Sequence, residues 1–407
     1  MIEWKCKLTN LTITPTMKSI SKNQSFFNSE KELSEYLLKN VSDSLKQAIK
    51  VTVSMMVKEE MKSIREELSE KLSFNGYYQR NLVSTAGKIE GIDIPRFRER
   101  PMGGLDLKSM EIFEKEKEGF HDLIAEMHRN GVSQGKITKI AKNCFGIRLS
   151  KQRIGYVHNQ LAEQEEFRIN NEAITDEFEY LYLDGIWVKC KNFGLNENNQ
   201  AVLLCALGVQ ADGQRKIIGF KFAFKEDYES WHEFLLSLKD RGLKSERLDC
   251  IISDDGTGLS SALSHLFPDI PHQSCIAHKM RNVIVRASPK NKTAIAEGLK
   301  GIYAAETEEE AKKKARSFMK EWYVKEEKAV RTFNFNFDKT LVYFNFPKDK
   351  WKQIRTSNVL EREFREVRRR IKVFDSSFNS PTSCKNYAGS IFSYLNDNYP
   401  EHLHSKS

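Results

Sequence analysis

A change of hydrophobic period near residue 178 constrains the fold of this 407-residue chain more than any other feature. Before this point, apolar residues recur mostly at the three- and four-residue spacing of helices, and after it they follow strand periodicity. The strand-like runs cover residues 178–183, 201–209, 216–224, 248–252 and 273–277. Helical patterns at 228–238 and 259–267 separate the last three runs. This order predicts a mixed α/β sheet that begins with three strands close together in sequence.

Composition is typical of a globular protein. Hydrophobic residues make up 40% of the chain and charged residues 30%, which excludes a disordered, collagen-like or low-complexity protein. A net charge of +9 is modest for this length but favours a polyanion as partner. No apolar run approaches the roughly 18 residues of a membrane span, and the first residues lack the apolar core of a signal peptide. Seven dispersed cysteines without a Cys-x-x-Cys pair indicate reduced thiols in a cytosolic protein.

Two segments at the start of the chain have different character. Residues 1–72 form a predicted N-terminal helical region, because apolar side chains repeat every three or four residues in much of it. This pattern fits an amphipathic helix packed within its own chain and also a dimer-forming helix. Residues 73–117 are a predicted basic connector with short strands, punctuated by glycine and proline. Its arginines fit either contacts to a phosphate backbone or a solvated connector.

Residues 118–165 carry the pattern of three helices joined by short links. Glycines are predicted to end the first two helices, and serines to cap the second and third. In chain order these residues are Gly131, Ser133, Gly146 and Ser150. The third helix presents Lys151, Gln152 and Arg153 on its outward face, where they can donate to phosphates and base edges. The arrangement fits a helix-turn-helix whose last helix enters a major groove, although helical triplets are also common in proteins that do not bind DNA.

Two aspartates follow apolar strand runs and are candidate catalytic residues. Asp184 comes directly after the first run, and Asp254 follows the fourth run after one serine. A carboxylate at the end of a buried strand is firmly held and can meet solvent at the sheet edge. Each acid also has a simpler interpretation. Asp184 with the next glycine fits a hairpin turn, and Asp254 fits a loop acid before a helix that Asp255 or Thr257 caps.

A third candidate acid, Glu361, lies near the start of the last strongly patterned helix. It shares one flank of that helix with Arg365 and Arg368, beside a stripe of apolar residues. An acid that leads a basic stripe can place a metal ligand next to a phosphate backbone. A capping box at the helix start explains the same glutamate without chemistry, and periodicity does not separate Glu361 from Glu363.

Three carboxylates suit phosphoryl transfer. Two divalent ions about 4 Å apart stabilise the attacking and the leaving oxygen, and hard ions such as Mg²⁺ or Mn²⁺ prefer oxygen ligands. The Cys275-x-x-His278 pair offers only two of the four ligands that zinc requires, so we expect no zinc site. A Cys-His nucleophile would leave the three acids unexplained. We expect Cys275 and His278 to support the reaction near the scissile phosphate, with Lys279 and Arg281 as phosphate contacts.

Taken in order, these motifs resemble those of Mutator-type bacterial insertion-sequence transposases, which have an Asp-Asp-Glu active site. The resemblance rests on residues 74–81, 126–150, 182–185, 230–243, 253–259, 267–282 and 356–361. Matched position by position, Asp184, Asp254 and Glu361 correspond to the family's metal-binding catalytic acids. Two positions depart from the family pattern: Asp255 stands where glycine is usual, and Ser274 where arginine is usual.

The resemblance implies a ribonuclease H-like catalytic domain, formed by residues 175–282 and 356–395, with an all-helical insertion at 283–355; the predicted strand order matches that fold. It implies a DNA transposase that binds terminal inverted repeats through its helix-turn-helix. Two Mg²⁺ or Mn²⁺ ions would serve strand cleavage and transfer. Double-stranded DNA is the expected partner, without a membrane, and a homodimer or larger assembly the expected form, in the cytoplasm at a bacterial nucleoid. The alternatives are an inactive or domesticated DNA-binding relative and a nuclease without strand transfer.

Overall fold

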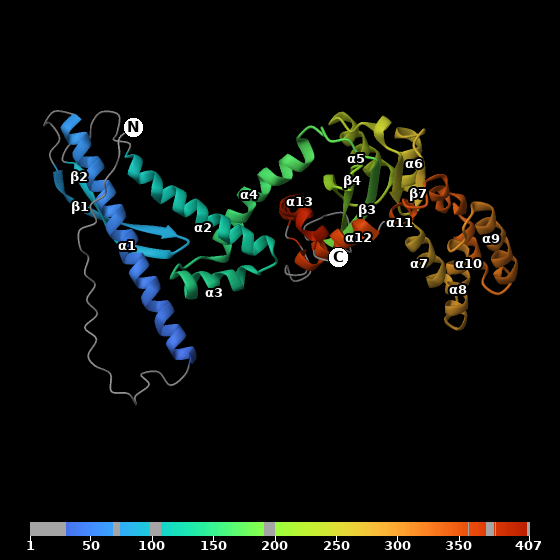
Figure 1. Cartoon of the computed structure of the whole chain (residues 1–407), viewed down its shortest axis with the longest axis horizontal. Coiled ribbons are helices and arrows are strands. Elements are labelled where there is room, and N and C mark those ends of the chain that lie inside the picture. The colour runs from blue at the N-terminus through green and yellow to red at the C-terminus, as the bar shows by residue number, and fades with distance from the viewer. Residues whose placement is uncertain are drawn as a thin grey trace. The chain divides into compact units, whose positions relative to one another are not determined.

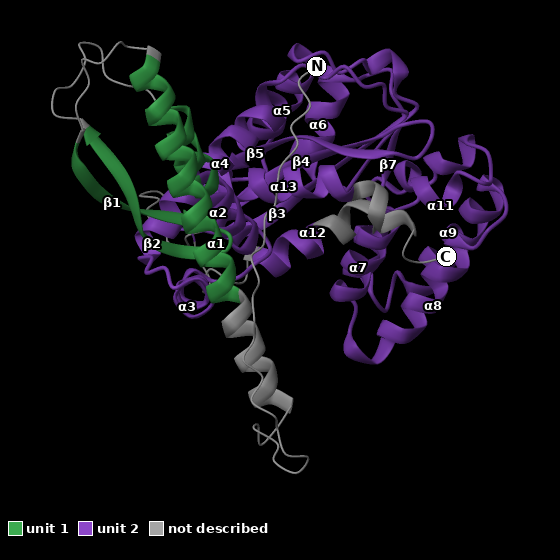
Figure 2. Ribbon diagram, turned by 60° about the vertical axis from the view of Figure 1, so that its left-hand side comes forward, with its two compact units in different colours: residues 1–117 green, residues 118–407 purple. Residues whose placement is uncertain are grey.

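The structure, a computed structural model, describes the main chain of residues 30–67, 74–97, 107–190, 200–356, 358–371, 378 and 380–404. Near the ends of some of these segments only the main chain is described, and residues 358–363 are among them. The chain divides into two compact units, residues 1–117 and residues 118–407 (Figure 2). None of the described helices is long and apolar enough to cross a membrane.

The first unit, over its described residues, combines a long helix with an antiparallel hairpin. Helix α1 covers Glu30–Glu67, strand β1 covers Phe74–Ser84 and strand β2 covers Gly87–Phe97. Apolar side chains that recur every four residues on α1 pack against the apolar face of the hairpin. These side chains are Val53, Val57 and Met61. The helix predicted within residues 1–72 is therefore confirmed.

The hairpin is longer than the short strands that the sequence predicts for residues 73–117. Each strand has 11 residues, and the glycines that suggested turns lie within the strands or at their ends. Gly76 and Gly91 adopt positive φ angles of 73° and 67° inside the strands. Gly76 coincides with a shift of register between Phe74 and Tyr77. The glycine therefore accommodates a bulge inside a continuous strand rather than ending it.

Three helices joined by short links lie between residues 111 and 171 and confirm the predicted pattern: α2 (Glu111–Arg129), α3 (Gln134–Phe145) and α4 (Lys151–Asn171). The predicted caps are confirmed as well. The side chains of Ser133 and Ser150 each accept a hydrogen bond from the backbone N–H three residues later. Gly146 ends α3 in the left-handed conformation, with a φ of 68°. Helix α4 packs against the C-terminal helix α13 (Pro381–His404).

Within the described residues, a mixed sheet of five strands forms the second unit's centre (Figure 1). In chain order the strands are β3 (Tyr180–Lys189), β4 (Gln200–Val209), β5 (Arg215–Ala223), β6 (Cys250–Ser253) and β7 (His272–Ser274). Their spatial order is β5-β4-β3-β6-β7, antiparallel from β5 to β3 and parallel from β3 to β7. The predicted meander and mixed sheet are confirmed, with α5 (Tyr228–Asp240) and α6 (Thr257–Leu266) between the later strands.

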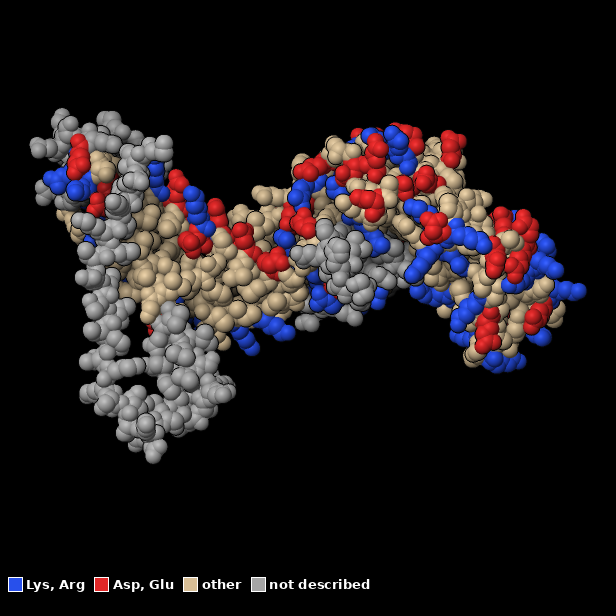
Figure 3. Space-filling model, in the orientation of Figure 1, with Lys and Arg blue, Asp and Glu red and all other residues tan. Residues whose placement is uncertain are grey.

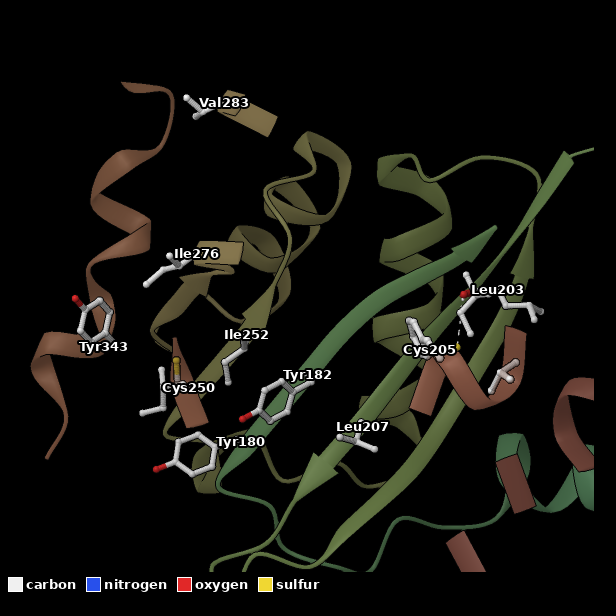
Figure 4. Packing of buried hydrophobic residues seen from close by; sticks show 14 of the residues in the cluster. Tyr180, Tyr182, Leu203, Cys205, Leu207, Cys250, Ile252, Ile276, Val283 and Tyr343 are labelled. Carbon is white, nitrogen blue, oxygen red and sulfur yellow. Dashed lines mark hydrogen bonds between the residues drawn. The ribbon is translucent and has the colours of Figure 1, made fainter. Parts of the chain in front are cut away.

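Successive side chains of β3 point to opposite faces of the sheet and enter two separate hydrophobic clusters. Leu181 and Leu183 belong to the cluster that the sheet forms with α5 and α6. Tyr180 and Tyr182 belong to the other cluster, between the sheet and the helices that follow β7 (Figure 4). Each face of the sheet is therefore buried, which explains the nearly continuous apolar runs in the sequence.

The stretch after β7 is helical, as predicted for residues 283–355. The helices are α7 (Ile276–Arg286), α8 (Lys292–Tyr303), α9 (Glu308–Trp322), α10 (Glu327–Asn334) and α11 (Trp351–Ile354), followed by α12 (Asn358–Ile371). Two 3₁₀ turns, Phe337–Thr340 and Val342–Asn345, precede α11. The buried amide of Gln273 on β7 donates to the Thr340 carbonyl at 3.0 Å and accepts from the Tyr343 N–H at 2.8 Å. These bonds fix the turns against the sheet.

Side-chain amides from two helices cover the backbone of β5, which lies at one edge of the sheet. Asn396 of α13 accepts a hydrogen bond from the Ile217 N–H at 2.8 Å and donates to the Ile217 carbonyl at 3.0 Å. Asn170 of α4 accepts from the Phe220 N–H at 2.9 Å. Backbone groups that an edge strand would otherwise leave open are thus paired without a further strand.

Candidate active site

The register of the parallel strands brings Asp184 and Asp254 to matching positions. Leu183 of β3 pairs with Ser253 of β6, so the next residue on each chain segment is one of the two aspartates. Strand β6 ends at Ser253, whereas β3 continues because β4 stays paired with it as far as Lys189. The predicted strand end at Asp184 and the alternative hairpin turn there are both wrong. Asp184 lies within a strand, at the point where the parallel neighbour stops.

The carboxylate of Asp184 is buried, with 9% of the residue exposed. Its Oδ1 accepts a hydrogen bond from the backbone N–H of Gly185 at 2.8 Å. Burial raises the pKa of Asp184 to about 6 and the negative charge of Asp254 adds to this, whereas His278 and Arg368 oppose the rise. A carboxylate in such a place is stabilised in its charged form by any cation that binds beside it.

A cavity of about 380 Å³ opens beside the two aspartates. Carboxylates, arginines, a histidine and a tryptophan line it: Asp184, Trp187, Glu226, Asp254, His278, Arg281, Arg365 and Arg368. All of these except Trp187 and Glu226 are among the residues that the sequence singles out. The fold therefore gathers acids able to hold divalent cations and arginines able to contact phosphate in one place.

Helix α12 supplies two of these arginines. Phe364 and Val367 are buried among the residues that pack on the sheet, which confirms the apolar stripe at these positions. Arg365 and Arg368 then reach the cavity. Glu361 lies one turn earlier on the same helix, and its side chain is outside the described residues. Its role therefore stays a prediction.

Two other residues that the sequence singles out lie outside the cavity lining. Cys275 is buried at the N-cap of α7, and its backbone N–H donates to the Ser253 carbonyl at 2.7 Å, which ties α7 to the end of β6. Lys279 is 3% exposed and forms an ion pair with Asp255 at 2.5 Å. Its ammonium group also donates to the Phe335 carbonyl. The structure thus holds Lys279 inside the protein rather than presenting it to DNA.

The buried ion pair gives the neighbouring aspartates different surroundings. Asp255 accepts further hydrogen bonds from Asn336 at 3.0 Å and from Ser274 at 3.3 Å. Asp254 lines the cavity, and its Oδ1 accepts from the Gly256 N–H at 3.1 Å. Helix α6 begins without a side-chain cap, so the predicted alternative of a capping Asp255 or Thr257 is wrong. The two departures from the family pattern, Asp255 and Ser274, thus contact each other in one network.

The residues predicted for the helix-turn-helix lie apart from this cavity. Lys151, Gln152 and Arg153 form the exposed first turn of α4. The guanidinium of Arg153 lies 5.2 Å from the ring centroid of Tyr156, one turn along the same helix. This turn therefore offers positive charge and hydrogen-bond donors at the start of a helix.

The described side chains do not form a ready metal centre. Among them, no group of three or more His, Cys, Asp or Glu residues is arranged to hold a metal ion. Glu361 is not part of that set, because its side chain is not described. Asp184 and Asp254 supply oxygen donors of the kind that Mg²⁺ and Mn²⁺ prefer.

Comparison with known proteins places the chain in a family. A family profile described as Transposase, Mutator family matches residues 18–402. The chain belongs to the Mutator family of transposases. Among its relatives in this family, the transposase for insertion sequence element ISRM5 of Rhizobium meliloti (strain 1021) is 28% identical over 373 residues, 90% of this chain and 91% of the relative.

Two further transposases show the same relationship. The transposase for insertion sequence element IS256 in transposon Tn4001 of Staphylococcus aureus is 29% identical over 334 residues, 80% of this chain and 81% of its own. The transposase for insertion sequence element IS406 of Burkholderia multivorans is 30% identical over 279 residues, 68% of this chain and 70% of its own. The resemblance inferred from the motifs is thereby confirmed at the level of the family.

Sequence reasoning missed Glu226 and Trp187. Glu226 stands just before Asp227, the N-cap of α5, where an acid suggests only helix capping. A topological signal was present, however. Strand β5 runs in the same direction as β3, with β4 between them, so the residues after β5 reach the same end of the sheet as Asp184.

Proposed function

We propose that this Mutator-family protein is a DNA transposase that cuts DNA at the ends of its insertion element and joins the freed 3′-hydroxyl groups to target DNA. The observation that carries the proposal is the position of Asp184 and Asp254, each directly after one residue of the pair Leu183 and Ser253 on two adjacent parallel segments. Arg281, Arg365 and Arg368 line the same cavity, where they would neutralise a phosphate backbone. Family membership supports the same activity.

Asp184, Asp254 and Glu361 would hold two Mg²⁺ or Mn²⁺ ions, and when bound these ions supply Lewis-acid stabilisation of the reacting phosphate. The fit rests on the burial of Asp184 beside Asp254 in one cavity, because a cation bound beside two neighbouring carboxylates stabilises the charged form of both. The strands fix the two aspartates, while the arginines orient the scissile strand. His278, at the wall of the same cavity, would support the phosphate.

The proposal extends to the fold and to DNA recognition. Strand order and the helical segment between α7 and α11 fit a ribonuclease H-like domain with an inserted helical region. Helices α2 to α4 would bind the inverted repeats, with the exposed first turn of α4 entering a major groove. In the view of Figure 3, Lys and Arg side chains gather over α7, whereas Asp and Glu side chains gather over α5 and α6. Since two element ends must be joined in one event, we propose that the protein acts as a dimer or larger assembly.

A cleavage assay tests this function. Full-length protein is incubated with labelled DNA that carries the element's ends, together with a second DNA as target, in Mg²⁺ or in EDTA. We expect Mg²⁺-dependent nicking at the ends and transfer into the target. Asp254→Ala should lower cleavage by at least about 10³-fold and leave DNA binding intact, because it removes an oxygen donor from the reacting site.

Asp269→Asn is the matched control, because this exposed aspartate lies beyond α6 and away from the cavity. It should cut as the wild type does. Undiminished cleavage by Asp254→Ala would contradict the assignment of the active site. Nicking without joined products would instead identify a nuclease, and binding without nicking would identify a DNA-binding relative.

A further inference from the structure

Glu226 shares the proposed active site without belonging to the three acids assigned so far. It lies between β5 and α5, where the chain leaves the sheet. The side chain of the next residue, Asp227, accepts a hydrogen bond from the Ser230 N–H at 3.1 Å and so caps α5. Glu226 has no such helix-capping role. It is partly buried and lines the cavity that Asp184 and Asp254 also line.

The backbone of β3 makes room for the Glu226 carboxylate. A Cβ atom placed on Gly185 would lie 2.7 Å from Oε1 of Glu226, closer than real Cβ atoms approach an oxygen. Glycine at position 185 therefore allows the carboxylate to lie directly against the strand, one residue from Asp184. Trp187, two residues further along β3, lines the same cavity as Glu226.

The carboxyl group of Glu226 senses the charges of both aspartates. Burial raises the pKa of Glu226 to about 7, and the charges of Asp254 and Asp184 add to the rise, while Trp187 and His278 oppose it. Three acids thus share one cavity of about 380 Å³. Without a cation their charges repel one another, and a divalent cation relieves that repulsion.

We propose that Glu226 is a further metal-binding carboxylate of the active site, which moves to act with Asp184 and Asp254 when divalent cations bind, since the described side chains are not already arranged around an ion. The inference rests on the proposed function, because it assigns a ligand to the metal site of that reaction. Two features favour a ligand over a structural acid: the opening that Gly185 leaves for the carboxylate, and its place on the wall that both aspartates share.

Binding of Mn²⁺ alone to the full-length protein tests the role of Glu226 without relying on activity. Free Mn²⁺ is counted by its electron paramagnetic resonance signal during a titration. We expect Glu226→Gln to weaken the binding of at least one ion by about tenfold or more. Glu229→Gln is the matched control, because it removes the same charge from an exposed position in the first turn of α5. The control should bind Mn²⁺ as the wild type does.

Thermal unfolding separates a ligand from a merely structural residue. Without metal, Glu226→Gln should melt at the same temperature as the wild type or higher, since one of three mutually repelling carboxylates is gone. With saturating Mn²⁺, its rise in melting temperature should be smaller than that of the wild type. A variant that melts earlier by the same amount with and without Mn²⁺ would show a structural role and overturn the proposal.

Asp184→Asn and Asp254→Asn distinguish failure of this inference from failure of the proposed function. If these two variants lose Mn²⁺ binding and cleavage while Glu226→Gln keeps its Mn²⁺ affinity, Glu226 is not a ligand and the proposed function stands. If none of the three variants changes Mn²⁺ binding, both proposals fail together.

Discussion

At the scale of single residues, the ion pair of Lys279 and Asp255 shows how a charged side chain can stabilise the fold rather than contact a partner at the surface. The two side chains are 3% and 10% exposed. Lys279→Met would leave the Asp255 carboxylate buried without its counter-ion, which typically costs about 3–5 kcal/mol. We expect that loss in the free energy of unfolding measured with urea at pH 7.

Asp255→Asn added to Lys279→Met should recover much of this loss, because it removes the uncompensated charge. A Lys279→Met protein that keeps full stability but loses affinity for DNA would instead restore Lys279 as a surface contact. The sequence alone favours that surface role, since Lys279 stands two residues before Arg281 in a basic run. Its partner is 24 residues away, and only the tertiary fold brings the two together.

At the scale of elements, buried histidines join α2 and α4 to α13. The ring centroids of His128 and His158 lie 4.5 Å apart, and the ring centroid of Tyr387 lies within 5.5 Å of both. Burial lowers the pKa of His128 to about 4 and that of His158 to about 3. Nε2 of His158 has no hydrogen-bond partner among the described residues. The burial of this junction therefore favours the neutral form of both imidazole rings.

Acidification should weaken this junction. In the unfolded chain the two histidines take up protons near pH 6.5, whereas in the folded chain they resist protonation to about pH 4 or below. Their contribution to stability is complete above pH 6.5 and is lost as the pH falls. Glu165 acts in the opposite direction, because burial raises its pKa to about 7 and its protonation favours the folded state.

A variant isolates the histidine effect. As the pH falls from 6.5 to 4, the free energy of unfolding should decrease less for His158→Phe than for the wild type. The difference should reach up to about 3 kcal/mol, because each unit by which folding lowers the pKa corresponds to about 1.4 kcal/mol. The measurement is a series of urea titrations at stepped pH. His232→Phe, on α5 and outside the junction, should follow the wild-type slope. Parallel slopes for His158→Phe and the wild type would contradict the assignment of neutral buried imidazoles.

The elements also show what the sequence can predict. Strand order and the caps at Ser133 and Ser150 follow from local signals, because periodicity and capping act within a few residues. The length of the β1–β2 hairpin does not follow, since Gly76 suggests a turn and instead accommodates a bulge. The continuation of β3 beyond Asp184 depends on its pairing with β4. Glu226 joins the cavity only through the topology of the sheet.

At the scale of the whole molecule, the positive charge of the chain should appear in the salt dependence of DNA binding. Affinity for DNA that carries the element's ends should fall steeply between 50 and 200 mM salt, because each phosphate contact releases counterions. Arg153→Gln should make the slope of log affinity against log salt shallower by about 0.9. Lys244→Gln is the control, since this lysine pairs with Glu177 at 2.7 Å. Equal slopes for Arg153→Gln and the wild type would remove the first turn of α4 from the DNA interface.

The two asparagines that bond to the backbone of β5 affect how copies of this protein can associate. Asn396 and Asn170 occupy, with their amides, the places that a neighbouring strand would take. An edge covered in this way offers fewer open backbone groups to a strand of a second chain, which opposes pairing between the sheets of two copies. Helix α13 therefore protects the edge of the sheet as well as packing against it. A chain truncated before α13 would expose the backbone of β5, and we expect aggregation of that chain before any loss of activity.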